Sequence, residues 1–337
     1  MREEKSPEVC VVIAAKDAAD TIGRAIQSAL REPEVAEVVV VDDGSSDTTS
    51  DVAKALDDGS GRLIVVRFEQ NQGPSAARNR AMAVSRAPLI AVLDADDFFF
   101  PRRFAAMIRE TGWDMIADNI GFIHHDPTEA IKPDRFHART RSLSIHDFVD
   151  GNISRRGRQR GEIGFLKPVM RRTFLEAHAL RYDEALRLGE DYDLYLRALV
   201  CGARYKVIDH CGYAAVVRSN SLSGRHRTED LRRLFEAERQ IRLSNPELSP
   251  ADQTVIRRHE RHIKARHDLR LALDVKAAGG LTGVARHLLQ HPDAVPAVVA
   301  GVMSDKLEAR RAGGQSEPPV PAGKLRYLLP GVPVAQK

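Results

Sequence analysis

The sequence predicts an α/β fold in which helices flank a mostly parallel sheet, followed by a C-terminal helical extension. In the first hundred residues short apolar segments alternate with helical patterns, and this alternation is typical of parallel strands joined by crossover helices. Beyond residue 226 the pattern is mainly helical. The chain has 337 residues, of which 43% are hydrophobic and 29% charged, which is the balance of a globular protein with a buried core.

Four strands are expected where aliphatic residues run almost without interruption, because strands buried on both faces of a parallel sheet are apolar throughout. These segments are Val9–Ala14, Val38–Val41, Leu63–Phe68 and Leu89–Leu93. Helices are expected between them, after Asp20, after Asp47 and after Pro74. Right-handed crossovers then bring the carboxyl ends of the strands to one edge of the sheet, where we expect a ligand crevice.

Two later stretches lack a regular pattern. Residues 124–160 are polar, with two prolines and a basic run, and we expect a long irregular excursion there. Residues 313–324 are rich in Gly and Pro, so residues 313–337 are expected to form a loose tail.

Charge and cysteine content exclude several classes of protein. Lys and Arg number 51 and Asp and Glu 47, and the resulting net charge of +4 is too small to indicate a nucleic-acid-binding protein. Cys10, Cys201 and Cys211 have no CxxC spacing, which argues against a disulfide framework and a structural zinc site. The N-terminus has no signal-peptide pattern, and no apolar run approaches the ~20 residues that cross a bilayer. We therefore expect a cytoplasmic protein.

A cluster of carboxylates follows the fourth expected strand, where the sequence reads Asp94, Ala95, Asp96 and Asp97. Negative charge at the end of a buried strand is costly unless a cation neutralises it. Carboxylate oxygens suit Mg²⁺ or Mn²⁺, and a metal held by one or two of them keeps positions open for substrate phosphates. The alternative is a solvated acidic turn, since Asp is common in turns.

Three further segments carry polar residues where strands end or helices begin. Asp42 and Asp43 follow the second strand, where their carboxylates can accept hydrogen bonds from a pyrimidine or a ribose. Arg78 lies in the third helix, where it either reaches a base or phosphate or is a surface residue. Glu190 and Asp191 start a later helix, where they either complement the helix dipole or supply a general base.

Four motifs stand in this order along the chain: VVIAAKDAADTI, VVVVDDGSSDTT, NQGPSAARNRAM with LIAVLDADD, and GEDYDLYLRAL. Together they resemble the family 2 glycosyltransferases of the GT-A fold. The resemblance covers about residues 7–225 and implies a GT-A (Rossmann-like) domain at 1–225, with a nucleotide-binding half at about 7–112 and an acceptor half at about 113–225. Residues 226–312 are then a helical extension. The chain is similar in particular to the glucosyltransferases of succinoglycan-type exopolysaccharide assembly in bacteria.

The resemblance implies roles for individual residues. Contact with a nucleotide sugar is implied for Ala15, Asp17, Asp42, Asp43, Arg78, Asp94, Ala95, Asp96 and Arg218. Asp94 and Asp96 form a DxD motif, in which Asp96 is the expected direct ligand of Mn²⁺ or Mg²⁺ and Asp94 the second metal residue. Asp191 matches the catalytic base. Arg218 stands where many relatives have a histidine that completes the metal site, so we expect Arg218 to contact the diphosphate instead.

The activity that the resemblance implies is the inverting transfer of a sugar, expected to be glucose, from a UDP-sugar to a saccharide or lipid-linked saccharide acceptor. Asp191 would take the proton of the acceptor hydroxyl while its oxygen attacks the anomeric carbon. The excursion at 124–160 is the expected acceptor-covering loop.

The helical extension carries a basic segment at 257–270, in which His259 and His262 stand three residues apart. The spacing of these histidines does not match a zinc motif, so we expect a solvated helix face. Such a face can touch anionic lipid at the inner face of the plasma membrane. No nucleic-acid partner is expected.

Two other functions stay open at this point. A nucleotidyltransferase also places metal-binding acids in an α/β sheet, but it needs an early glycine-rich basic loop, and residues 14–23 have no glycine cluster. A noncatalytic GT-A-like scaffold in a polysaccharide assembly complex has no need of Asp94, Asp96 and Asp191, which are all present.

Overall fold

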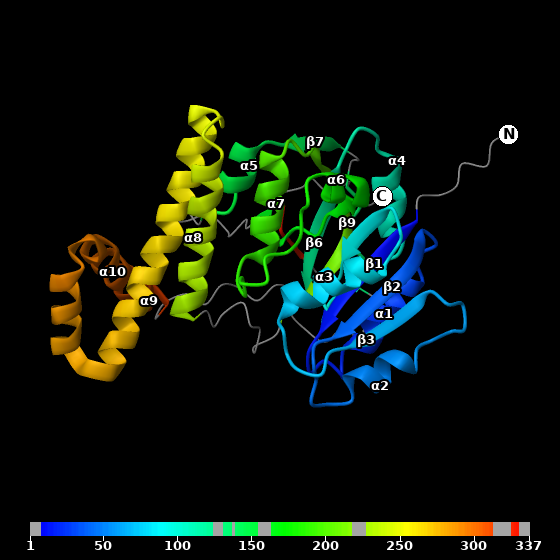
Figure 1. The fold of residues 1–337 in the computed structure, drawn as a ribbon, viewed down its shortest axis with the longest axis horizontal. Coiled ribbons are helices and arrows are strands. Elements are labelled where there is room, and N and C mark those ends of the chain that lie inside the picture. The colour runs from blue at the N-terminus through cyan, green and yellow to red at the C-terminus, as the bar shows by residue number, and fades with distance from the viewer. Residues whose placement is uncertain are drawn as a thin grey trace. The chain divides into compact units, whose positions relative to one another are not determined.

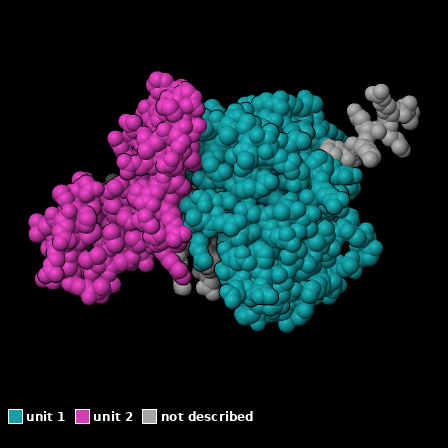
Figure 2. All heavy atoms as spheres, in the orientation of Figure 1, with its two compact units in different colours: residues 1–219, 325–337 teal, residues 220–324 magenta. Residues whose placement is uncertain are grey.

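The computed structural model describes residues 8–123, 131–136, 139–153, 163–217, 227–312 and 325–329. The chain divides into two compact units, one formed by residues 1–219 with 325–337 and the other by residues 220–324 (Figure 2).

The first unit is built on one sheet, in which the strands lie in the order β3-β2-β1-β4-β8-β6-β9-β5, with β10 beside β6 and β7 beside β9. The strands are β1 Val9–Ala15, β2 Val35–Asp42, β3 Leu63–Arg67, β4 Leu89–Val92, β5 Phe98–Phe99, β6 Met115–Ile123, β7 Thr140–Leu143, β8 Val169–Arg171, β9 Tyr205–Val216 and β10 Arg326–Tyr327. The first four strands are parallel to one another, as are β6 and β9, whereas the other pairs between described strands are antiparallel. The sheet is therefore mixed, and its parallel part is the N-terminal half.

Helices of the first unit cover this sheet (Figure 1). They are α1 Ile22–Leu30, α2 Thr49–Lys54, α3 Pro74–Val84, α4 Arg103–Arg109, α5 Ile145–Asp150, α6 Arg172–Ala177 and α7 Glu190–Val200. α1 forms because Ile22, Ala25, Ile26 and Ala29 recur on one face, and all four are fully buried. α3 begins with Pro74, whose fixed backbone angle suits the first turn of a helix.

The α/β fold and the βαβ order predicted from the sequence are confirmed. The first strand lies between the second and the fourth, and Ala15 at its end is in register with Asp42. The loops that leave the carboxyl ends of β1, β2 and β4 therefore meet at one edge of the sheet, which is where the sequence predicted a crevice.

Two predictions about irregular segments are wrong in part. Within 124–160, which was expected to be irregular, residues 140–150 form β7 and α5, and α5 begins with a capping box between Ser144 and Asp147. Within 313–337, which was expected to be a loose tail, residues 325–329 return to the first unit, where β10 pairs with β6.

The returning segment is held by specific contacts. The Asn119 side chain exchanges two hydrogen bonds with the backbone of Leu329, at 3.0 and 2.8 Å. Leu325 and Tyr327 pack against a small buried cluster around Phe100 and Ile123. These contacts depend on residues about 200 positions away in the sequence, so the short apolar run Leu325–Leu329 gave no local sign of them.

The second unit contains the long helices α8 Thr228–Ser244, α9 Pro250–Gln290 and α10 Val295–Ala312. α8 and α9 pack through apolar residues, and the His259 ring meets Glu238 at 2.9 Å inside that interface. The prediction that 257–270 is a solvated face is therefore wrong for His259, which is 4% exposed. It holds for Arg257, Arg258 and Arg261, which are exposed. No helix in the described ranges combines the length and the apolar character needed to span a membrane.

Candidate active site

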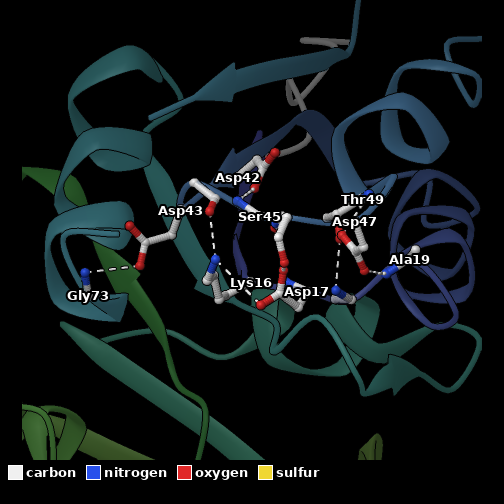
Figure 3. A network of polar contacts seen from close by, with 12 residues as sticks. Lys16, Asp17, Ala19, Asp42, Asp43, Ser45, Asp47, Thr49 and Gly73 are labelled. Atoms are coloured by element: carbon white, nitrogen blue, oxygen red, sulfur yellow. Dashed lines mark hydrogen bonds and ion pairs between the residues drawn. The ribbon is translucent and has the colours of Figure 1, made fainter. Parts of the chain in front are cut away.

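The loops after β1 and β2 are tied together by short polar contacts (Figure 3). The Asp17 carboxylate accepts hydrogen bonds from the backbone N–H of Ser46 at 2.7 Å and from its hydroxyl at 3.0 Å, while the Asp17 N–H donates to the Ser45 hydroxyl at 2.9 Å. These hydrogen bonds, the backbone one foremost, hold the pKa of Asp17 below its usual value. Lys16 Nζ donates to the carbonyl of Gly44 at 2.6 Å. Asp17 thus anchors the loop, and its predicted contact with a nucleotide stays a prediction.

Asp42 and Asp43 are both buried at the end of β2, but their carboxylates differ. Asp43 accepts hydrogen bonds from two successive N–H groups of the loop before α3, at 2.6 and 2.9 Å, so each of its oxygens has a donor. Asp42 Oδ1 accepts from the N–H of Ser45 at 2.9 Å, whereas Oδ2 has no hydrogen-bond donor within the described residues and lies 3.6 Å from Nε of Arg67. Asp42 Oδ2 is thus a buried oxygen without a hydrogen-bond donor among the described residues, whereas each oxygen of Asp43 already accepts one hydrogen bond.

The turn after β4 carries Asp94, Ala95, Asp96 and Asp97, and one of its carboxylates is mainly structural. Asp97 Oδ2 accepts a hydrogen bond from the hydroxyl of Tyr213 at 2.8 Å, and Oδ1 accepts one from a backbone N–H of β9 at 2.9 Å. Burial, together with the neighbouring Asp94 and Asp96, raises the pKa of Asp97 to about 8. Asp97 is therefore harder to ionise than an ordinary aspartate, whereas Asp94 is held in its charged form by Lys167 and Arg78.

Charged residues from three separate segments meet at Asp94. Arg78 of α3 donates to Asp94 Oδ1 at 2.9 Å and to Glu190 Oε1 at 2.7 Å. Lys167, just before β8, places Nζ 2.9 Å from Asp94 Oδ2 and 2.7 Å from Asp191 Oδ2. Both cations are at least 94% buried, so water screens these ion pairs weakly. Burial alone would raise the pKa of Asp94, but Lys167 and Arg78 together hold it well below its usual range.

Asp191 lies at the start of α7 and is 8% exposed. Its Oδ1 is 3.7 Å from Arg78 and accepts no hydrogen bond from the described residues. Burial would raise the pKa of Asp191, but Lys167 and then Arg78 lower it, so the carboxylate is anionic at neutral pH. Burial, with the Asp191 charge as the next cause, raises the hydroxyl pKa of Tyr182 and Tyr195 nearby. The anionic Asp191 thus has one oxygen held by a lysine and one buried oxygen without a hydrogen-bond donor among the described residues.

Asp94 and Asp96 are the predicted metal residues of this turn. Both oxygens of Asp94 already contact cations, and Asp96 lies partly buried in the same turn. Within the described ranges no group of three or more His, Cys, Asp or Glu side chains is arranged to hold a metal ion. Mg²⁺ and Mn²⁺ need no such group when substrate phosphates and water complete the coordination. The role of Asp94 as a second ligand stays a prediction.

The structure gathers most of the predicted residues into two groups at one edge of the sheet. Asp94, Arg78 and Asp191 belong to one array of ion pairs, which also includes Glu190 and Lys167. Asp17 and the two acids after β2 form the other group. Ala15, at the end of β1, accepts a hydrogen bond from the Asp43 backbone N–H at 2.8 Å. Arg218 lies outside the described residues, as do parts of the predicted acceptor loop at 124–130, 137–138 and 154–160.

Sequence reasoning missed Lys167. It stands between Leu166 and Pro168, in a run whose flanking residues Leu166, Val169 and Met170 are all fully buried. A single lysine in an apolar run was the available signal, because a lysine is rarely buried unless a carboxylate pairs with it.

Comparison with known proteins establishes the family. Residues 10–176 match the description "Glycosyl transferase family 2". The chain is also 57% identical over 335 residues to the succinoglycan biosynthesis protein ExoU of Rhizobium meliloti (strain 1021), which covers 98% of this chain and 97% of the relative. The chain belongs to glycosyltransferase family 2. This family 2 glycosyltransferase is 40% identical over 225 residues to ExoO of the same organism, covering 65% of this chain and 64% of the relative.

A solved structure shares the fold of this family 2 glycosyltransferase. The Staphylococcus aureus TarS fragment 1–349, in complex with UDP-GlcNAc, superposes with a TM-score of 0.62 over 94% of this chain and 95% of that one, at 19% identity. The predicted enzyme class and GT-A fold are therefore confirmed, and neither a nucleotidyltransferase nor a noncatalytic scaffold is favoured.

Proposed function

We propose that this glycosyltransferase transfers a sugar, which we take to be glucose, from a UDP-sugar to a saccharide or lipid-linked saccharide acceptor in bacterial exopolysaccharide assembly. The observation that carries the proposal is the set of ion pairs that joins the anionic carboxylate of Asp191 to Asp94 of the DxD turn through Lys167. The succinoglycan role in the name of its 57% identical relative and the UDP-GlcNAc bound to TarS support the substrate class.

The proposed chemistry is an in-line displacement with inversion. Asp191 Oδ1 accepts the proton of the acceptor hydroxyl, whose oxygen forms a bond to the anomeric carbon of the donor. The bond from that carbon to the diphosphate oxygen breaks, and its electron pair leaves with UDP. A general base within hydrogen-bond reach of the hydroxyl contributes about 10²- to 10⁴-fold to such a step.

The donor-side residues have different proposed tasks. Asp43, with Asp42 beside it at the end of β2, is the proposed contact for the uracil. Asp96 would hold Mn²⁺ or Mg²⁺, with Asp94 beside it. The metal, when bound, supplies positive charge against the diphosphate. We propose Arg218 as a further diphosphate contact.

We also propose a cytoplasmic location with peripheral contact at an anionic membrane surface. The exposed Arg257, Arg258 and Arg261 of α9 support this, because clustered arginines attract anionic head groups. Flotation with vesicles that contain anionic lipid tests the contact, and protein that stays unbound would contradict it.

Calorimetric titration of UDP tests the donor and metal assignments together. We expect UDP to bind at least about tenfold more tightly with Mn²⁺ than with a chelator, and the Asp96→Ala variant to lose this difference. Asp51→Ala, which removes an exposed carboxylate of α2, is the matched control and should behave like the wild type. Equal affinity with and without Mn²⁺ in the wild type would contradict the metal role, and no UDP binding in either condition would contradict the donor.

A further inference from the structure

Lys167 is a buried lysine whose backbone position is fixed by the fold. Its carbonyl accepts a hydrogen bond from Arg103 at 2.6 Å. Arg103 is itself held by Asp118, through contacts of 3.0 and 3.1 Å, and both of these side chains are completely buried. The lysine therefore extends from a rigid anchor into the site, and its side chain is only 7% exposed.

Arg78 and Lys167 differ in their distances from the carboxylates of Asp94 and Asp191. Arg78 lies 2.9 Å from Asp94 Oδ1 but 3.7 Å from Asp191 Oδ1, so its hydrogen bond goes to Asp94. Lys167 contacts both, at 2.9 Å from Asp94 Oδ2 and 2.7 Å from Asp191 Oδ2. Lys167 thus provides the short contact with Asp191 that Arg78 does not make, at 2.7 Å against 3.7 Å.

We propose that Lys167 is a positioning residue for sugar transfer, which holds Asp191 by Oδ2 so that Oδ1 receives the proton of the acceptor hydroxyl. This proposal rests on the function proposed above. The proton moves from the acceptor oxygen to Asp191 Oδ1, the acceptor oxygen bonds to the anomeric carbon, and UDP leaves with the electron pair of the broken bond. Throughout this step the lysine keeps its proton and its contact with Oδ2.

The shared contact also links the base to the donor side of the site. Because one ammonium group bridges Asp94 and Asp191, it fixes the separation between the DxD turn and the base. When Lys167 is removed, Asp94 keeps its hydrogen bond to Arg78, whereas Asp191 loses its shortest cation contact. Removing the Lys167 ammonium group should therefore slow proton transfer and leave the affinity for the donor nearly unchanged.

The test compares Lys167→Met, which has similar length without charge, with Lys167→Arg and with Lys206→Met. Lys206 lies on β9, where Nζ donates to the Thr111 carbonyl at 2.8 Å, and it serves as the matched control. The measured quantities are kcat, KM for the UDP-sugar, the Kd of UDP and the midpoint of thermal unfolding. We expect kcat of Lys167→Met to fall by about 100-fold, because misplacing a catalytic group by about 1 Å has this effect.

The same variant should bind UDP within about threefold of the wild type, since Arg78 still holds Asp94. Lys167→Arg, whose guanidinium can reach both carboxylates, should recover about tenfold of the lost turnover. A kcat within about threefold of the wild type in Lys167→Met would overturn the proposal. A parallel loss of kcat and UDP binding would also overturn it, because this result indicates a structural role alone.

Two further results separate this proposal from the proposed function. If Lys167→Met does not fold, Lys167→Gln replaces it. The same result is then expected, a large fall in kcat with little change in the Kd of UDP. A wild-type protein that transfers no sugar from any UDP-sugar contradicts the proposed function itself. An active wild type with an equally active Lys167→Met contradicts only the role of Lys167.

Discussion

The Asp191→Asn variant is expected to lose about 10²- to 10⁴-fold in kcat while it binds UDP nearly as the wild type does. The asparagine keeps the shape of the side chain but cannot take a proton. Asp191 is 8% exposed, and its carboxylate is anionic because Lys167 and Arg78 outweigh the effect of burial on its pKa. The donor site keeps Asp94 and Asp96, so UDP binding has no reason to fall. Steady-state kinetics and calorimetry on the same protein preparation measure both quantities.

The control for this variant is Asp183→Asn, which changes an exposed acid in the loop before α7. Its carboxylate accepts a local hydrogen bond from the N–H of Ala185 at 2.9 Å and takes no part in the proposed chemistry, so kcat should stay near the wild-type value. Turnover in Asp191→Asn within about fivefold of the wild type would show that another group removes the proton.

The Arg78→Met variant is expected to lose about 3–5 kcal/mol in the free energy of unfolding. Arg78 is 5% exposed and is the guanidinium between Asp94, Glu190 and Asp191. Without it, Glu190 loses its ion pair, and Asp94 and Asp191 share Lys167. A buried charge that loses its partner is strongly destabilising. Urea denaturation followed by circular dichroism measures the change.

Arg80→Met is the matched control, because Arg80 lies on the same helix and is exposed. Its free energy of unfolding should change by less than about 0.5 kcal/mol. If Arg78→Met were as stable as this control, the array would contribute little to the fold. Arg78 would then be retained for ligand contact alone.

The helices and strands that could be predicted are those that a pattern of residues close together in the sequence indicates. The strand β1, Val9–Ala15, is apolar throughout, its parallel neighbours are mainly apolar, and Pro74 marks the start of α3. The strand β10 gave no comparable signal, because two residues form it and its stability comes from Asn119 and a distant apolar cluster. His259 was misjudged for the same reason, since its partner Glu238 lies on another helix.

The residues of the candidate site also differ in how far the sequence could predict them. Motif position was enough to select Asp94 and Asp191, which the structure brings into one array. It could not show that Asp43 accepts hydrogen bonds from two backbone N–H groups, or that the pKa of Asp97 is raised, because these properties depend on burial and on neighbouring groups. Lys167 belongs to no motif, and only the folded arrangement of β4, α7 and the segment before β8 gives it two carboxylate partners.

The measurement that tests the central claim most directly is nuclear magnetic resonance of the complete reaction, with the wild-type protein, an α-linked UDP-glucose and a lipid-linked saccharide acceptor from bacterial membranes. We predict that UDP is the released nucleotide and that a new β-glycosidic anomeric signal appears on the acceptor. The Asp191→Asn variant should not produce this signal at a comparable rate. An α-linked product, or release of pyrophosphate in place of UDP, would contradict inverting sugar transfer by this site.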